Sequence, residues 1–91
     1  MAVLTVDLYL PGSLSLKDKR AILRKLKERL ANKFNISIAE VDFLDKWQRA
    51  RIGIAQVSND YKFLEKSMNT ILNIIDEDDS AEVTEHLLEY L

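Results

Sequence analysis

Hydrophobic and polar residues alternate along several stretches of the chain. Residues 3–10 alternate, which predicts a strand because successive side chains of a strand point to opposite faces. Residues 36–44 and 50–57 repeat the pattern and predict two further strands. Residues 81–91 fit either a strand or a short helix, and we favour the strand because it completes the order of elements.

Between these strands, apolar residues recur with a helical period. Residues 16–33 contain no glycine or proline and follow two serines suited to an N-cap, so they are predicted to form a helix. We expect Asn35 to end this helix in the left-handed conformation. A second helix follows residues 58–60, all good N-caps, and runs to about Ile75. Four acidic residues come next, and we expect this end to fray because acids are unfavourable there.

The predicted order is strand–helix–strand–strand–helix–strand. With right-handed crossovers this order gives a ferredoxin-like βαββαβ fold, an α+β two-layer sandwich. Its four-stranded antiparallel sheet has the strand order 4-1-3-2 and carries both helices on one face. A chain of 91 residues is long enough for one modest core, so we expect a single domain over residues 1–91.

The orientation of each strand decides what the open face of the sheet presents. We expect the helices to cover the apolar positions of the first strand and the small residues of the next two: Leu4, Val6, Leu8, Leu10, Ala39, Val41, Gly53, Ala55 and Val57. The open face then holds Val3, Tyr9, Ile36, Ile38, Ile52 and Ile54. So apolar a face predicts a homodimer, through the face or an edge strand. The alternative is that the second and third strands turn their other side inward, because a shift of one residue exchanges the faces.

Composition narrows the class of protein. The chain is 47% hydrophobic and 31% charged, which is typical of a folded globular domain. No apolar run approaches the roughly 20 residues of a membrane helix, and no signal peptide opens the sequence, so we expect a cytoplasmic protein without membrane contact. The chain has no cysteine, one histidine, two glycines and no catalytic motif. We therefore expect a non-enzymatic binding protein with no cofactor and no metal.

The net charge of −2 conceals a gradient along the chain. Residues 1–33 hold eight lysines and arginines against three acids, whereas residues 59–91 hold two against nine. Most of the first-helix cations lie on one flank of the apolar stripe, like a ridge that contacts phosphates, although such a row can also be a solvated helix face. Lys19 falls within the stripe, so it either overhangs the sheet or reaches a buried carboxylate. The candidate nucleic-acid contacts are Lys17, Lys19, Arg20, Arg24 and Lys27.

Two features lie near the connection between the second and third strands. Trp47 stands in a polar segment and either anchors a partner or folds back as a lid on the core, and we favour the lid. Glu40 and Asp42 fall on the same predicted strand face, with Asp45 nearby. Two such carboxylates could share a proton or hold Mg²⁺, which keeps a carboxylate-based enzyme open as a further alternative.

Several motifs together resemble the YlxP-like family of bacterial proteins. They run in register from about residue 3 to residue 75: Leu10-Pro11-Gly12, Ser15-Leu16-Lys17, Lys19-Arg20, Phe34-Asn35-Ile36-Ser37-Ile38-Ala39-Glu40-Val41, Asp45, Trp47-Gln48, Ala50, Gly53, Ala55 and Val57-Ser58-Asn59-Asp60. The resemblance implies a ferredoxin-like fold in a family classed as of unknown function. Its genes often lie beside translation-initiation and ribosome-maturation genes, which implies a role linked to the ribosome or to RNA.

The resemblance also marks candidate contacts for a partner or ligand. These are Glu40, Trp47 and Gln48. They match motifs of the family, as do the first cations of the helix, Lys17, Lys19 and Arg20. We therefore predict a small binding protein that acts on ribosomal RNA or a pre-ribosomal particle. The alternative is a homodimeric protein-interaction or regulatory module that does not bind nucleic acid.

Overall fold

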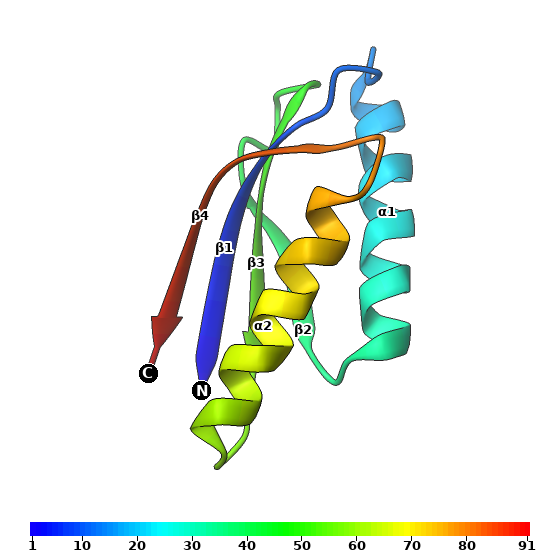
Figure 1. Cartoon of the computed structure of the whole chain (residues 1–91). Helices are drawn as coiled ribbons and strands as arrows, with labels where there is room; N and C mark the ends of the chain where they lie inside the picture. Colours follow the sequence, from blue (N-terminus) through cyan, green and yellow to red (C-terminus); the bar gives the residue numbers. More distant parts are fainter.

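The order and topology of the elements follow the hydrophobic pattern closely. The computed structural model describes all residues, Met1–Leu91. Its elements are β1 (Ala2–Tyr9), α1 (Leu16–Lys33), β2 (Ser37–Asp42), β3 (Arg49–Gln56), α2 (Tyr61–Asp76) and β4 (Glu82–Tyr90). All strand pairs are antiparallel, the sheet order is β2-β3-β1-β4, and both helices pack on one face (Figure 1). The ferredoxin-like α+β fold and the strand at the C-terminal end are confirmed.

Side-chain caps fix where both helices begin. The Ser15 hydroxyl accepts a hydrogen bond from the backbone N–H of Asp18 at 3.1 Å. The Asp60 carboxylate accepts one from the N–H of Phe63, also at 3.1 Å. Each cap satisfies one of the N–H groups that a first helical turn leaves unpaired. Both caps lie among the residues predicted for them.

The end of α1 differs from the prediction. Phe34 closes the helix in an extended conformation, with its N–H donating to the carbonyl of Leu30 at 2.9 Å. Asn35 is not left-handed, because the only positive φ in the chain belongs to Phe43. The chain therefore leaves α1 directly into an extended segment that leads to β2, and the predicted left-handed end is wrong.

The core lies between the sheet and the helices. It contains the predicted Leu4, Val6, Leu8 and Leu10, together with Ala2 at the start of β1. Its helical members are Leu23, Leu26, Leu30, Leu64, Met68, Ile71 and Ile75. Neither α1 nor α2 has the length and apolar character that a membrane-spanning helix needs.

The inward faces of β2 and β3 are the reverse of those expected. Ile52 and Ile54 are fully buried beneath the helices, whereas Val57 is 80% exposed. The residues misassigned to the open face are Ile36, Ile38, Ile52 and Ile54, and those misassigned to the covered face are Ala39, Val41, Gly53, Ala55 and Val57. Both sets alternate, and the larger side chains turn inward because their burial removes more apolar surface from water. The isoleucine-rich open face that predicted a dimer does not exist.

Gly53 is a close-packing position between β2 and β3. A Cβ there would lie 3.2 Å from Cγ1 of Val41 on the neighbouring strand. The contact lies on the open face, beside the irregularity in β2 between Glu40 and Asp42. The absence of a side chain at Gly53 therefore lets β2 approach β3 where the register shifts.

Candidate functional site

A row of cations follows one flank of α1. Arg20, Arg24 and Lys27 line a hollow of about 210 Å³ between α1 and β2, with Glu40 on its far side. Lys17 lies exposed on the same flank, closer to the helix start. None of these four cations forms an ion pair within the protein. We call Lys17, Arg20, Arg24 and Lys27 the α1 ridge.

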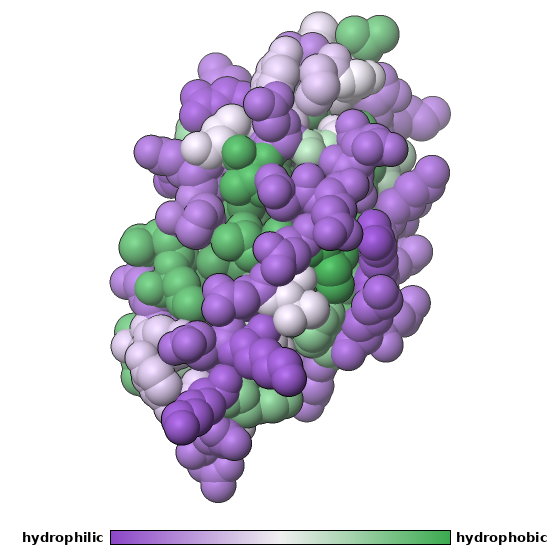
Figure 2. All heavy atoms as spheres, in the orientation of Figure 1, coloured by the Kyte–Doolittle hydropathy of each residue, from purple (hydrophilic) through white to green (hydrophobic).

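The surface of the molecule along α1 is strongly polar. In Figure 2 hydrophilic atoms cover the side of the molecule formed by α1, on the right of the view, while hydrophobic atoms gather along β4 and the adjoining side of α2. Exposed, unpaired lysine and arginine side chains are the groups that neutralise phosphates and release their counterions. The ridge is thus available to a polyanion.

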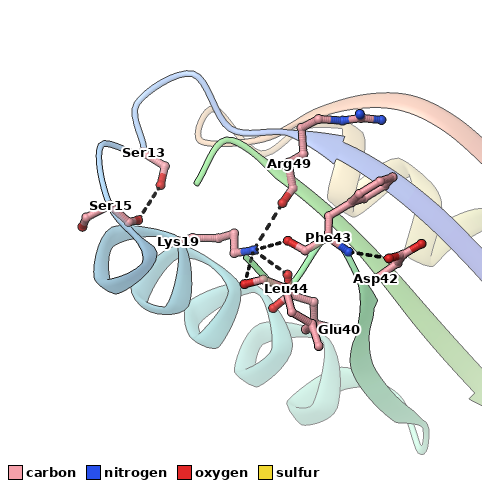
Figure 3. Close-up of polar contacts among 8 residues, drawn as sticks. All are labelled: Ser13, Ser15, Lys19, Glu40, Asp42, Phe43, Leu44 and Arg49. Carbon is pink, nitrogen blue, oxygen red and sulfur yellow. Dashed lines mark hydrogen bonds and ion pairs between the residues drawn. The ribbon is translucent and has the colours of Figure 1, made fainter. Parts of the chain in front are cut away.

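Lys19 does not belong to this exposed row. Its side chain is 1% exposed, and Nζ lies 2.8 Å from Oε2 of Glu40 and 2.8 Å from the carbonyl oxygen of Phe43. The carbonyls of Leu44 and Arg49 lie at 3.4 and 3.3 Å (Figure 3). An ammonium group has three donors, and here all of them have acceptors. Lys19 reaches a carboxylate inside the protein, and its assignment as a nucleic-acid contact is corrected because it is buried.

The Lys19 contacts hold an unusual backbone conformation. Phe43 has a φ of 60°, which costs a residue with a side chain about 1–3 kcal/mol. Its N–H donates to Asp42 at 2.8 Å, and the guanidinium groups of Arg49 and Arg51 lie 4.2 and 5.0 Å from the centre of its ring. These contacts, together with Lys19 on the carbonyl, fix the start of the β2–β3 connection (Figure 3).

Gln48 joins this connection to the one between β1 and α1. Its side-chain amide donates to the carbonyls of Pro11 and Ser13 at 3.3 and 3.2 Å. Its own carbonyl accepts from the N–H of Leu10 at 2.9 Å. Gln48 and Lys19 therefore tie the two connections together at one end of the sheet. The structure thus gives Gln48 a role in the fold, whereas the sequence had made it a candidate partner contact.

Trp47 is not a lid on the core. It is 56% exposed, and the inward position of this connection is taken by Gln48. The preferred prediction for Trp47 is wrong, and the alternative of an exposed anchor for a partner remains a prediction. Of the three residues proposed as partner contacts, Trp47 alone is largely exposed, since Glu40 is held by Lys19.

Glu40 and Asp42 do not share a face of the sheet. The register of β2 shifts between them, so Glu40 pairs with Lys19 on the helix side while Asp42 contacts Arg51 at 3.2 Å on the open side. Proton sharing and Mg²⁺ binding both need carboxylates side by side. The prediction that these two carboxylates act together is wrong because the irregular strand breaks the period of two.

An ion pair that sequence reasoning missed lies on the open face of the sheet. Arg51 contacts Asp7 through Nε at 2.6 Å and Nη2 at 3.0 Å. The hydrogen bonds and positive charge of Arg51 lower the pKa of Asp7 below its usual value. The signal was present in the sequence, because antiparallel pairing of β1 with β3 places Asp7 opposite Arg51.

Sequence reasoning also missed a cavity at the other end of the helical layer. The cavity has a volume of about 510 Å³ and lies between the end of α1, the end of β3 and the first half of α2. Two polar atoms among its lining residues, Oε1 of Gln56 and Oγ of Ser67, are buried without a hydrogen-bond partner. Native proteins contain few such atoms, and each one requires an explanation.

Fold and site together define a small ferredoxin-like protein whose first helix carries unpaired cations. The family model "Protein of unknown function (DUF503)" matches residues 1–87, and the chain belongs to that family. The chain is similar to "Uncharacterized protein YlxP" of Bacillus subtilis (strain 168), with 47% identity over 62 residues, 68% of this chain and 67% of the relative. The resemblance found in the motifs is confirmed.

Proposed function

We propose that this protein binds ribosomal RNA or a pre-ribosomal particle through the α1 ridge. The observation that carries the proposal is the row of cations on α1 that have no ion-pair partner in the protein. Arg20 and Lys27 are seven residues apart, which spans roughly 10 Å along the helix axis. Such a row can contact several phosphates of one strand at once. This role would place the protein in the cytoplasm.

The acidic part of the molecule supports a fixed orientation on RNA. Nine acids lie in residues 59–91, among them the run 76–79 at the end of α2 and three glutamates on β4. A polyanion is repelled from these surfaces and attracted to α1. The charge distribution therefore favours one binding face rather than general coating of nucleic acid.

Co-sedimentation with purified ribosomal subunits tests this proposal. The ridge variant carries Arg20→Glu, Arg24→Glu and Lys27→Glu. Its matched control carries Lys25→Glu, Arg29→Glu and Lys62→Glu, which reverses three exposed cations outside the ridge and changes the net charge equally. At low salt we expect the wild type and the control to sediment with one subunit and the ridge variant to lose at least nine-tenths of this binding. Equal losses in both variants, or no binding by the wild type, would contradict the proposal.

A second candidate function is a homodimeric interaction module that uses the open face of the sheet. Val41 and Leu87 on this face are 55% and 57% exposed. Arg51 on β3 and Glu85 on β4, the two strands that flank β1, give the face opposite charges, so two copies could pair around a twofold axis. This proposal predicts a dimer in sedimentation velocity that Leu87→Glu converts to a monomer, with no dependence on RNA. A monomeric wild type would exclude it.

A further inference from the structure

The cavity at the far end of the helical layer has the composition of a ligand site. Its rim carries two lysines, Lys33 from the end of α1 and Lys66 from α2, and neither forms an ion pair. Its walls include Phe34, which is half-buried, and Phe63, which is 50% exposed. A volume of about 510 Å³ lies within the usual range for small-ligand pockets.

The lining of the cavity contains polar groups that the fold itself does not use. Gln56 is 4% exposed and Ser67 is 6% exposed, yet Oε1 of Gln56 and Oγ of Ser67 have no hydrogen-bond partner. Gln56 is the last residue of β3 and points under the helices, and Ser67 lies on the inward side of α2. Both residues line the cavity, so a bound molecule toward which these side chains turn would supply the missing hydrogen-bond partners.

We propose that this cavity binds a nucleotide, with the base inside and the phosphate between Lys33 and Lys66. The aromatic rings of Phe34 and Phe63 provide apolar surfaces on which a planar base can stack. The lysine ammonium groups at the rim supply the charge that a phosphate requires. The edge of a base carries both donors and acceptors, which matches an unpaired amide and an unpaired hydroxyl.

The amide group of Gln56 can form two hydrogen bonds with the edge of adenine. A glutamine amide can accept from N6–H and donate to N7 of adenine at the same time. Ser67 can donate to or accept from any base edge, so it adds affinity without selectivity. An adenine nucleotide is therefore a suitable probe of the cavity.

Two sources can supply such a nucleotide, a free nucleotide or an unstacked residue of a single-stranded RNA. The inference does not depend on the α1 ridge, because none of the ridge residues lines this cavity. The ridge variant defined above should bind the nucleotide as the wild type does. Failure of one proposal therefore leaves the other intact.

Nuclear magnetic resonance titration of the ¹⁵N-labelled protein tests the inference. The probes are adenosine 5′-monophosphate, inorganic phosphate and a single-stranded oligoadenylate. We expect the monophosphate to shift the amides of Ser58, Ser67 and Thr70 in a saturable way, and phosphate alone to act much more weakly. Shifts with both nucleotide probes support either source, and shifts with the oligoadenylate alone support the inference with RNA as the source. No shift of these amides with either nucleotide at millimolar concentration overturns it, as do equal shifts with phosphate.

Variants separate a ligand site from a structural role. Gln56→Met should weaken binding of the monophosphate at least tenfold and raise the Tm, because it removes an unpaired buried polar group. Ser67→Ala should raise the Tm in the same way and weaken binding less. Lys66→Ala should weaken binding several-fold, whereas Lys62→Ala, an exposed lysine of α2 outside the cavity, should not. A lower Tm for Gln56→Met together with unchanged affinity would contradict the inference.

Discussion

The buried polar groups at the two ends of the helical layer differ in their hydrogen bonding. Where α1 begins, every donor of the Lys19 ammonium has an acceptor, and the contacts join α1 to the β2–β3 connection. Where α1 ends, Gln56 and Ser67 are equally buried but have unpaired atoms. An unpaired buried polar atom costs about 1–3 kcal/mol. The contrast separates polar groups that build the fold from those that remain available to a ligand.

Removal of the Lys19 ammonium should have the largest effect. Lys19→Met leaves Glu40 and the carbonyl of Phe43 without their partner, and we expect it to lower the free energy of unfolding by about 3–5 kcal/mol. Urea denaturation measures this change. Lys17→Met, at an exposed position on the same helix turn, should change the free energy by less than about 0.5 kcal/mol. A loss below about 1 kcal/mol for Lys19→Met would show that its contacts do not hold the connection.

The ion pair on the open face should have a smaller effect that depends on pH. We expect Asp7→Asn to lower the free energy of unfolding by about 1.5 kcal/mol at pH 7, since Arg51 is one-third exposed and water screens the pair. Arg51 lowers the pKa of Asp7 in the folded protein. The stabilisation by the ionised Asp7 is therefore complete above about pH 3.9, the pKa of Asp7 in the unfolded chain. It is lost as the pH falls through the lower pKa that Asp7 has in the folded protein.

Denaturation at pH 7 and near pH 3 checks this dependence. The difference between the wild type and Asp7→Asn should be largest at pH 7 and should shrink in acid. A difference that stays constant over this range would mean that the charge of Asp7 does not stabilise the folded protein. The comparison also shows how a partly exposed ion pair differs from the buried Lys19 pair.

Ser67→Ala should change stability in the opposite direction. It removes an unpaired buried hydroxyl and introduces a better helix former, so we expect a gain of about 1 kcal/mol in the free energy of unfolding. Asn69→Ala, at an exposed position of the same helix, reports the gain from helix propensity alone. Equal gains in the two variants would indicate that the Ser67 hydroxyl carries no burial penalty.

Trp47→Ala should have the smallest effect on stability. Because Trp47 is 56% exposed, we expect a loss below about 0.5 kcal/mol, whereas a buried tryptophan on the core would cost about 3–5 kcal/mol. The same thermal or urea denaturation measures both cases. A loss of several kcal/mol would show instead that Trp47 covers the core as a lid, as the sequence analysis predicted.

Local sequence patterns were sufficient for the order of elements and for the bounds of α1. Ser15 and Asp60 cap their helices as predicted, and the inward face of β1 was unambiguous because leucines and valine alternate with threonine and aspartate. In β3 Ile52 and Ile54 alternate with Gly53 and Ala55, and Arg49 and Arg51, which belong to the set of Gly53, were the signal that this set faces away from the helices.

The candidate site was only partly predictable for a related reason. Helical spacing placed the cations of α1 on one flank, and it placed Lys19 in the apolar stripe where the structure buries it. The irregularity in β2 left no mark in the sequence pattern, so the separation of Glu40 from Asp42 was missed. The cavity at Gln56 and Ser67 forms where the end of α1 meets the distant segment from β3 to α2, and single-sequence patterns do not report such long-range contacts.

The salt dependence of ribosome binding tests most directly whether the α1 ridge contacts RNA phosphates. The association constant of the wild type, the ridge variant and the matched control with the same ribosomal subunit is measured over a range of salt concentrations. Each phosphate contact contributes about 0.7–0.9 to the slope of log K against log salt, so loss of three contacts should reduce the slope by about 2–3. We expect this reduction for the ridge variant and an unchanged slope for the control. Equal slopes for the two variants would contradict binding through α1.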